Sequence, residues 1–305
     1  MRRIEFGYNP PTGTRQIEVF DPRTFVRDLQ AVLDVASQAF SSLWFSDHLM
    51  TVEPFRMECW TEMTWAAARF PGPLLGTIVM ANSYRPPALM AKMAASLQAF
   101  SHGRLVLGYG AGWHETEYRA YGYPFPKASQ RIAEMVEGIQ VMRAMWSDAP
   151  ANFKGRYYEI ADAYCEPRPE VPIPIMIGGD GEQLTLKAVA EHGDWWNALM
   201  RPRALLQHKI DVLDEHCRKA GRDPAEIRKT LTRTVYLKRS KAEAEAWAGS
   251  KLQNENPPFA GEPSELVDHL QELSALGFDL FQMVFPGFPD TSDIRLFIDE
   301  VLPRF

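Results

Sequence analysis

The stretch from Leu74 to Gly122 constrains the fold of this chain most, because it contains one complete βαβ unit. Two apolar runs, Leu74–Met80 and Leu105–Tyr109, predict buried strands, and the segment between them has helical periodicity. The buried face expected for this helix comprises Leu89, Met93, Leu97 and Phe100. Strands joined by a helix run parallel, so their carboxyl ends share one rim, where we expect the active site.

The same alternation of strand and helix recurs along the whole chain. Further strands are expected at Ile4–Tyr8, Ser42–Ser46, Ile173–Ile177, Asp194–Asn197, Leu231–Tyr236 and Leu280–Phe285. Helices are expected after Asp21, through Thr61–Arg69, at Ala128–Trp146 and Glu182–His192, after Pro202, and at Lys241–Trp247, Pro263–Leu276 and Ile294–Val301. Eight such units predict an α/β fold, a (β/α)8 TIM barrel formed by residues 1–305 as a single domain. A doubly wound open sheet is the alternative.

Small insertions are expected in the βα loops of this barrel, among them a surface hairpin over Phe153–Tyr164. On a barrel, the rim formed by the carboxyl ends of the strands builds the active site. The segments expected on this rim are Tyr8-Asn9, Asp47-His48, Asn82, Gly110–Trp113, Gly178–Gly181, Trp196-Asn197 and Phe285-Pro286.

Composition excludes several classes of function. Apolar residues make up 46% of the 305 residues, as in an ordinary globular protein. The 33 Lys and Arg against 39 Asp and Glu give a net charge of -6 without a basic block, which argues against a nucleic-acid partner. Cys59, Cys165 and Cys217 form no C-x-x-C pair, so neither a disulfide framework nor a structural zinc site is expected. No apolar segment has the pattern of a signal peptide or the length of a membrane helix, so we expect a cytoplasmic protein with no membrane partner.

His48 is the candidate for proton transfer. It is the one histidine of seven placed directly after an expected strand on this rim, and imidazole titrates near neutral pH. The alternative is that Asp47 and His48 only cap the loop, and position in the sequence leaves both interpretations open. His102 and His114 are expected to be loop residues, because no second ligand stands at a metal-binding spacing. We therefore predict no metal site.

Two glycine-rich turns are the candidate cofactor-binding segments. Gly178, Gly179 and Gly181 join a strand to a helix, where free backbone N–H groups bind phosphate. The alternative is a tight turn that needs a positive φ, but the late βα loops of a barrel often bind phosphate, which favours the functional interpretation. Asp180 opposes a phosphate unless its side chain points away. The turn Gly110-Ala111-Gly112 lacks the last glycine of the dinucleotide fingerprint, so we expect it to lie beside a flat ring instead.

These residues together identify a family resemblance. The chain resembles the bacterial luciferase-like monooxygenase superfamily, and within it the oxidoreductases that depend on the deazaflavin coenzyme F420. The resemblance covers nearly the whole chain. It is carried by Leu43–His48, Leu75–Val79, Gly103–Leu105 with Gly110–Trp113, and Ile177–Gly179.

The resemblance implies a TIM barrel, usually a homodimer, with the deazaflavin across the carboxyl ends of the strands. It implies a cis peptide between Ile78 and Val79 beside the ring, with Asp47, Gly110, Ala111, Gly112, Gly178 and Gly179 as further cofactor-binding residues. Asn82 and Gly181, which are expected on the same rim, are also predicted to bind the cofactor. His48 matches a histidine proposed as acid or base in hydride transfer to or from an organic substrate. Trp113 lies where sugar-phosphate dehydrogenases of this kind have a glutamate, and Ala81 replaces a cofactor-binding threonine, so a sugar-phosphate substrate is disfavoured.

Two alternatives to an F420-dependent oxidoreductase remain. One is an FMN-dependent monooxygenase supplied with reduced flavin by a separate reductase, because both branches of the superfamily share the barrel and its ring-binding loops. The other belongs to a different class, a noncatalytic flavin-binding protein, and is suggested by the missing glutamate.

Overall fold

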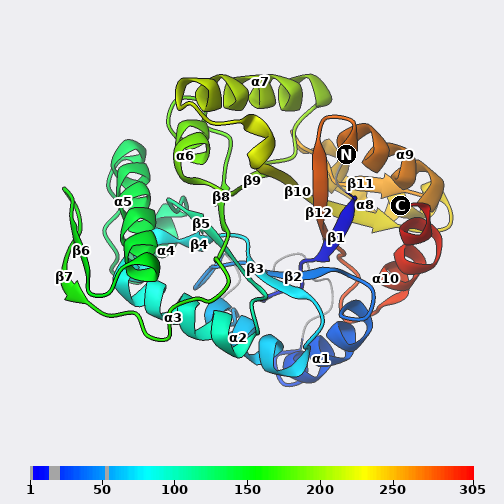
Figure 1. Ribbon diagram of the computed structural model, residues 1–305. Helices are drawn as coiled ribbons and strands as arrows, with labels where there is room; N and C mark the ends of the chain where they lie inside the picture. The colour runs from blue at the N-terminus through cyan, green and yellow to red at the C-terminus, as the bar shows by residue number, and fades with distance from the viewer. Residues whose placement is uncertain (1–2, 14–20, 52–54) are drawn as a thin grey trace.

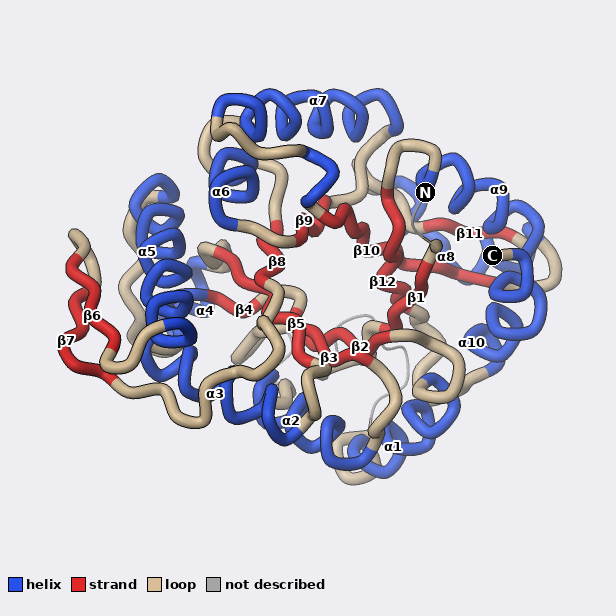
Figure 2. The backbone as a smooth tube through the Cα atoms, viewed as in Figure 1, coloured by secondary structure: helices blue, strands red, loops and turns tan. Residues whose placement is uncertain are grey.

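The strands form a closed barrel of parallel strands. The computed structural model describes residues 3–13, 21–51 and 55–305. The barrel strands are β1 (Glu5–Tyr8), β2 (Ser42–Phe45), β3 (Leu74–Thr77), β5 (Leu105–Gly110), β8 (Ile175–Gly178), β9 (Trp195–Ala198), β10 (Arg228–Leu237) and β12 (Phe278–Val284). Each is hydrogen-bonded to its neighbours in this order, and β12 pairs with β1 to close the ring (Figures 1 and 2). Closure confirms the (β/α)8 barrel and excludes the open sheet.

Helices surround this ring on its outer side, as Figure 2 shows. The helices are α1 (Phe25–Ala36), α2 (Cys59–Arg69), α3 (Pro87–Phe100), α4 (Glu115–Ala120), α5 (Ala128–Ser147), α6 (Thr185–His192), α7 (Arg203–Lys219), α8 (Lys241–Ala248), α9 (Pro263–Ser274) and α10 (Ser292–Leu296). A residue of a parallel strand points alternately into the barrel and toward these helices. The strands are therefore buried on both faces, which explains their nearly continuous apolar sequences.

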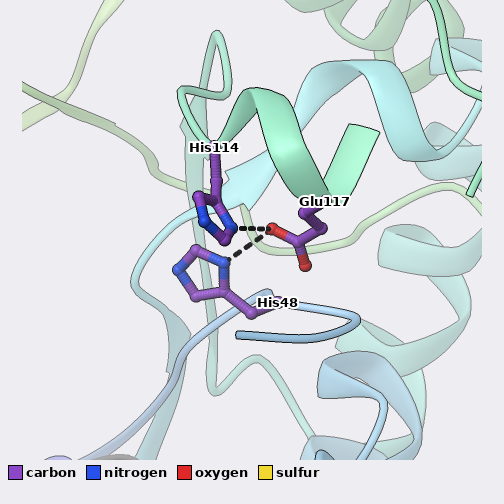
Figure 3. Close-up of side chains that lie close together, drawn as sticks. All are labelled: His48, His114 and Glu117. Carbon is purple, nitrogen blue, oxygen red and sulfur yellow. Dashed lines mark hydrogen bonds and ion pairs between the residues drawn. The ribbon is translucent and has the colours of Figure 1, made fainter. Parts of the chain in front are cut away.

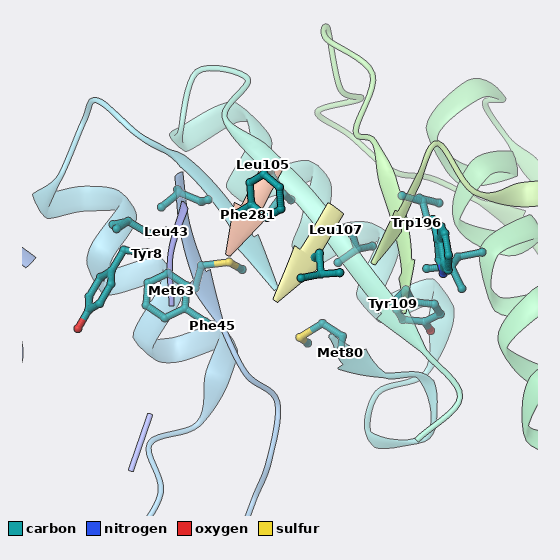
Figure 4. Close-up of a cluster of buried hydrophobic side chains, with 14 of the residues drawn as sticks. Tyr8, Leu43, Phe45, Met63, Met80, Leu105, Leu107, Tyr109, Trp196 and Phe281 are labelled. Carbon is teal, nitrogen blue, oxygen red and sulfur yellow. The ribbon is translucent and has the colours of Figure 1, made fainter. Parts of the chain in front are cut away.

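One hydrophobic cluster fills the interior of the barrel, and a larger one fills the space between the strands and the helices. Trp44 packs inside the barrel with Val106, Met176 and Leu280. A larger cluster between the strands and the helices includes Leu43, Phe45, Leu107 and Trp196 (Figure 4). The neighbours Trp195 and Trp196 belong to the inner and the outer cluster respectively, as expected for core residues on one strand.

The insertions lie outside the ring. The strands β6 (Ala151–Lys154) and β7 (Glu159–Ala163) form the expected antiparallel hairpin, which lies beyond α5 in Figure 2. The sequence did not predict the short strand β11 (Phe259–Gly261), which pairs with β10, or the six-residue helix α4. Both are too short to show a periodic pattern. The run expected as one strand at Leu74–Met80 is divided into β3 and β4 (Met80–Ala81).

The buried face predicted for α3 was wrong in part. Leu89 is 51% exposed and Phe100 is 82% exposed, whereas the residues that face the core are mainly Met90, Leu97 and several alanines. Alanines allow α3 to approach its neighbour α5 closely, and these two helices are packed together. Side-chain hydrophobicity alone therefore predicted part of the buried face of α3 wrongly, because the close packing of α3 against α5 favours small side chains.

The structure also bears on the predictions about cysteines and membrane helices. Cys59, Cys165 and Cys217 are all buried as free thiols, which agrees with the absence of a disulfide framework. Within the described ranges, no helix has the length and apolar character needed to cross a membrane.

The packing of Trp44 against Gly76 gives a stability prediction. A Cβ added to Gly76 would overlap the indole ring of Trp44. It would lie 2.8 Å from Cδ2 of Trp44 and closer still to Cε3 and Cζ3. We expect Gly76→Ala to lower the free energy of unfolding by about 1–3 kcal/mol, because overpacking shifts the interior of the barrel. The measurement is equilibrium denaturation in urea.

Gly72→Ala is the matched control. Gly72 is exposed, and the nearest atom to its added Cβ would be the Ser37 carbonyl oxygen at 3.9 Å. This variant should stay within about 0.5 kcal/mol of the native protein. Equal stability of the two variants would contradict the assignment of Trp44 as the tightly packed interior of the barrel.

Candidate functional site

A cavity of about 650 Å³ opens at the carboxyl ends of the barrel strands. Its size lies within the usual range for cofactor and ligand sites. The candidate catalytic and cofactor-binding residues that line it are His48, Ile78, Val79, Gly110, Ala111, Gly112, Gly178 and Gly179. Four further residues of the expected rim segments also line it, namely Asn9, Trp113, Asn197 and Phe285. The candidate residues come from the ends of β2, β3, β5 and β8, the other four from the ends of β1, β5, β9 and β12, and closure of the barrel brings them together.

The peptide between Ile78 and Val79 forms part of the cavity wall. It is a non-proline cis peptide, which confirms the prediction from the family resemblance. Val79 also explains two of the glycines around it. A Cβ would lie 2.7 Å from Val79 Cγ2 if added to Gly110, and 3.1 Å from Val79 Cγ1 if added to Gly178. These glycines make room for Val79 itself.

The loop between β8 and α6 forms another side of the cavity. Gly179 has a φ of +118°, a conformation that side chains disfavour, and its carbonyl oxygen accepts a hydrogen bond from Trp196 Nε1 at 2.7 Å. Thr185, the first residue of α6, also lines the cavity. Asp180 is paired with Arg201 at 3.0 Å, so its negative charge is compensated. The loop can therefore face an anion at the start of α6 without opposing it.

Asp47 lies beside this cavity and does not line it. Its buried carboxylate accepts hydrogen bonds from the Ala81 amide at 2.9 Å and from Arg85, whose two terminal nitrogens lie at 3.0 and 3.1 Å. Burial raises the pKa of Asp47, and the guanidinium of Arg85 opposes that shift. Arg85 also pairs with Glu58, which caps the start of α2. Asp47 thus connects the ends of β2 and β4.

Two other residues predicted to bind the cofactor also lie outside the cavity lining. Asn82 is buried; its oxygen accepts from the Tyr109 hydroxyl at 2.8 Å, and its nitrogen donates to Tyr158 at 3.0 Å. Gly181 precedes α6, and its carbonyl oxygen accepts from the Leu186 amide. In this structure Asn82 connects β5 to the hairpin region, and Gly181 takes part in the start of a helix.

His48 lines the cavity and is bonded on its other side to a buried carboxylate. Its Nδ1 lies 2.9 Å from Oε2 of Glu117, which is on α4 (Figure 3). The other oxygen of Glu117 accepts the backbone amides of Leu49 and Met50. Burial would raise the pKa of Glu117, but the bonds from His48 and these amides lower it to about 2. Glu117 is therefore ionised at neutral pH.

The cluster around Glu117 also includes His114, whose Nδ1 lies 3.4 Å from the same Oε2. One ring nitrogen of His48, one ring nitrogen of His114 and one carboxylate oxygen of Glu117 lie within 4.8 Å of one another, an arrangement that can hold a metal ion. The hydrogen bonds of Glu117 account for the cluster without an ion. The absence of a metal stays a prediction.

Several site residues were not identified from the sequence. They are Pro10, Pro11, Thr12, Ser46, Arg56, Glu117, Ala128, Arg131, Ile132, Thr185, Leu199, Thr232, Thr234, Val284 and Phe288. Most lie one or two residues from an expected strand end or on a loop, where sequence position does not reveal which side chain points inward. Glu117 had a usable signal, because it follows His114 at the i+3 spacing that places two side chains on one helix face.

Comparison with known proteins places the chain in a family. The profile of the family described as luciferase-like monooxygenase matches residues 12–277. An F420-dependent glucose-6-phosphate dehydrogenase of Kineococcus radiotolerans is 28% identical over 246 residues, which are 77% of this chain and 72% of that protein.

Two solved structures share the fold. An F420-dependent secondary alcohol dehydrogenase in complex with an F420-acetone adduct superposes with a TM-score of 0.81 at 20% identity, covering 100% of this chain and 98% of that one. Monooxygenase RslO1 from Streptomyces bottropensis gives 0.83 at 19% identity, covering 98% and 99%. With a family profile that spans most of its length and a barrel that agrees with these structures, the chain belongs to the luciferase-like monooxygenase family.

Proposed function

We propose that the protein is an F420-dependent oxidoreductase in which His48 gives or takes the proton that accompanies hydride transfer. The observation that carries the proposal is the composition of the cavity wall. Among the lining residues that the structure describes, none is an aspartate or glutamate, and His48 is the one histidine, the residue type most often used for proton transfer. His48 is therefore the lining residue that we propose to exchange a proton with a bound substrate.

The residues of the cavity fit a deazaflavin. The apolar side chains of Ile78 and Val79 offer a surface for a flat ring, and the cavity continues to Gly179 and Thr185 at the start of α6, which suits a phosphate group. The relative from Kineococcus radiotolerans is named for F420, which supports the same cofactor here. Asp47, Asn82 and Gly181 would act on the cofactor through the loops they hold.

When bound, the deazaflavin supplies the hydride chemistry. The protein's part is to orient the reactants and to move a proton. If hydride is added to a substrate carbon, His48 donates a proton to the atom that gains the electron pair. In the opposite direction the same nitrogen accepts the proton that leaves. The two directions use one residue, so the proposal does not depend on which of them operates.

The substrate we propose is not a sugar phosphate. Trp113, which is 65% exposed, lines the cavity where a carboxylate was expected for that chemistry. Part of the cavity wall is apolar, with Val284 at the end of β12 and Phe285 and Phe288 in the segment that follows it. These side chains favour an organic substrate with an apolar body. The resemblance also supports a homodimer, for which light scattering of the purified protein is the first check.

Cofactor binding tests the proposal directly. We expect oxidised F420 to quench the intrinsic fluorescence of the purified protein in a saturable titration, and FMN to bind more weakly. Ala111→Phe should weaken F420 binding at least about tenfold, because the larger side chain enters the cavity. The control is Ala120→Phe, an exposed position on α4 outside the cavity, which should bind as the native protein does.

Tight binding of FMN without any binding of F420 would contradict the proposal. Oxygen-dependent turnover with reduced FMN would then support a monooxygenase. Binding of either cofactor without turnover of any substrate would support a noncatalytic flavin-binding protein.

The role of His48 has its own test. We expect His48→Ala to lower the turnover number by about 10²–10⁴-fold, the usual contribution of a positioned acid or base, while cofactor affinity changes little. Turnover is followed by F420 absorbance with a panel of alcohols, ketones and sugar phosphates. His208→Ala, on the exposed side of α7, is the control. Unchanged turnover in His48→Ala would remove His48 from the mechanism.

A further inference from the structure

We propose that Glu117 is the positioning residue for His48: it holds the proton on Nδ1 and leaves Nε2 free for the substrate. The role of His48 rests on the function proposed above, but the state of its ring is a property of the free protein. The two side chains come from separate parts of the barrel, the loop after β2 and the helix α4, and meet at the edge of the cavity (Figure 3).

The direction of the hydrogen bond follows from the chemistry of its partners. An ionised carboxylate has no proton to give, so the 2.9 Å contact requires a proton on Nδ1 of His48. In a neutral imidazole the other nitrogen, Nε2, then carries a lone pair. Within the described part of the chain, no group is hydrogen-bonded to Nε2. The ring is therefore set to accept a proton from the cavity and, once charged, to return it.

Glu117 is itself fixed on all sides. Its side chain is fully buried, and the Leu49 and Met50 amides bind Oε1 while His48 binds Oε2. The carboxylate cannot rotate without losing one of these bonds. Because Leu49 and Met50 directly follow His48, the same carboxylate fixes both the imidazole and the backbone that carries it. This is the arrangement by which an acidic residue orients a catalytic histidine in other enzymes.

Other titratable groups also surround His48. They are His114 beside Glu117, Asp47 and Tyr84, which line a second, smaller cavity together with His48, and Arg56 and Arg131 on the main cavity. Asp47 is bonded to Arg85, and Arg131 donates to the Gly112 carbonyl oxygen at 3.3 Å. His114 Nδ1 approaches Glu117 Oε2 at 3.4 Å without a hydrogen bond. Glu117 is thus the hydrogen-bond partner of His48 among these groups.

Glu117→Gln separates positioning from simple packing. The amide has the same shape, but the two backbone amides at Oε1 require its oxygen on their side. Its NH₂ group then faces His48, and Nδ1 must become the acceptor. The neutral ring would carry its proton on Nε2 and present a donor to the cavity in place of a lone pair. The variant therefore changes the tautomer while the packing stays similar.

Nuclear magnetic resonance of the protein without cofactor determines which ring nitrogen of His48 carries the proton. With ¹⁵N-labelled histidine, spectra at about pH 9, above the ordinary titration range of imidazole, distinguish the two neutral tautomers. The His48 signals are identified by their loss in His48→Ala. We expect the proton on Nδ1 in the native protein and in the control Glu115→Gln, an exposed residue of the same helix paired with Arg119. We expect it on Nε2 in Glu117→Gln.

Kinetics supply the second measurement once turnover is established. We expect Glu117→Gln to lower the turnover number by at least about 10²-fold, with a much smaller change in KM, because the wrong tautomer is present. In a His48→Ala background the same substitution should have no further effect, since Glu117 acts through His48. Glu117→Asp, which keeps the charge, should recover part of the activity.

The outcomes separate the two proposals. The same tautomer in the native protein and in Glu117→Gln, or fully additive losses in the double variant, would overturn the role of Glu117. Failure to bind F420 would overturn the proposed function and would leave the tautomer of the free protein unchanged. If Glu117→Gln does not fold, the spectra of Glu117→Asp and of the native protein still decide whether Nδ1 carries the proton.

Discussion

The pairing of β12 with β1 is the constraint on which the rest of the structure depends. Residues Glu5–Tyr8 lie in parallel register with Leu280–Met283, so the first and last strands of the chain join and the sheet has no open edge in the ring. Once the ring is closed, the carboxyl ends of all its strands meet on one rim. Loops separated by more than two hundred residues, such as those that carry Asn9 and Phe285, then line one cavity.

The end of β2 shows how two adjacent polar residues serve different partners. Asp47 turns to Arg85 and the Ala81 amide and holds the segment that follows the cis peptide. His48 turns to Glu117 and to the cavity. Buried charges are costly unless each is paired, and both carboxylates here are paired. The consequence is a histidine held at the wall of the main cavity by a group, Glu117, that does not itself line that cavity.

The glycines of the site have more than one physical role. Gly110 and Gly178 are small because Val79 occupies the space that a side chain would fill, whereas Gly179 adopts a backbone conformation that favours glycine. A glycine-rich sequence near a strand end is thus compatible both with ligand binding and with packing of the protein on itself. Here the packed side chain is itself part of the cavity wall, so the two roles meet at Val79.

The sequence by itself determined the alternation of strands and helices, the rim on which polar residues gather, and the candidate histidine, because these depend on local periodicity and on the position of a residue relative to a strand end. Only the tertiary structure decided which residues act together. Glu117 and His48 are 69 positions apart, and their contact depends on a six-residue helix too short to show a pattern. Likewise, the buried face of α3 was set by its close approach to α5, which Leu89 and Phe100 could not reveal. Long-range contacts of this kind follow from how the elements pack, and packing is a property of the whole barrel.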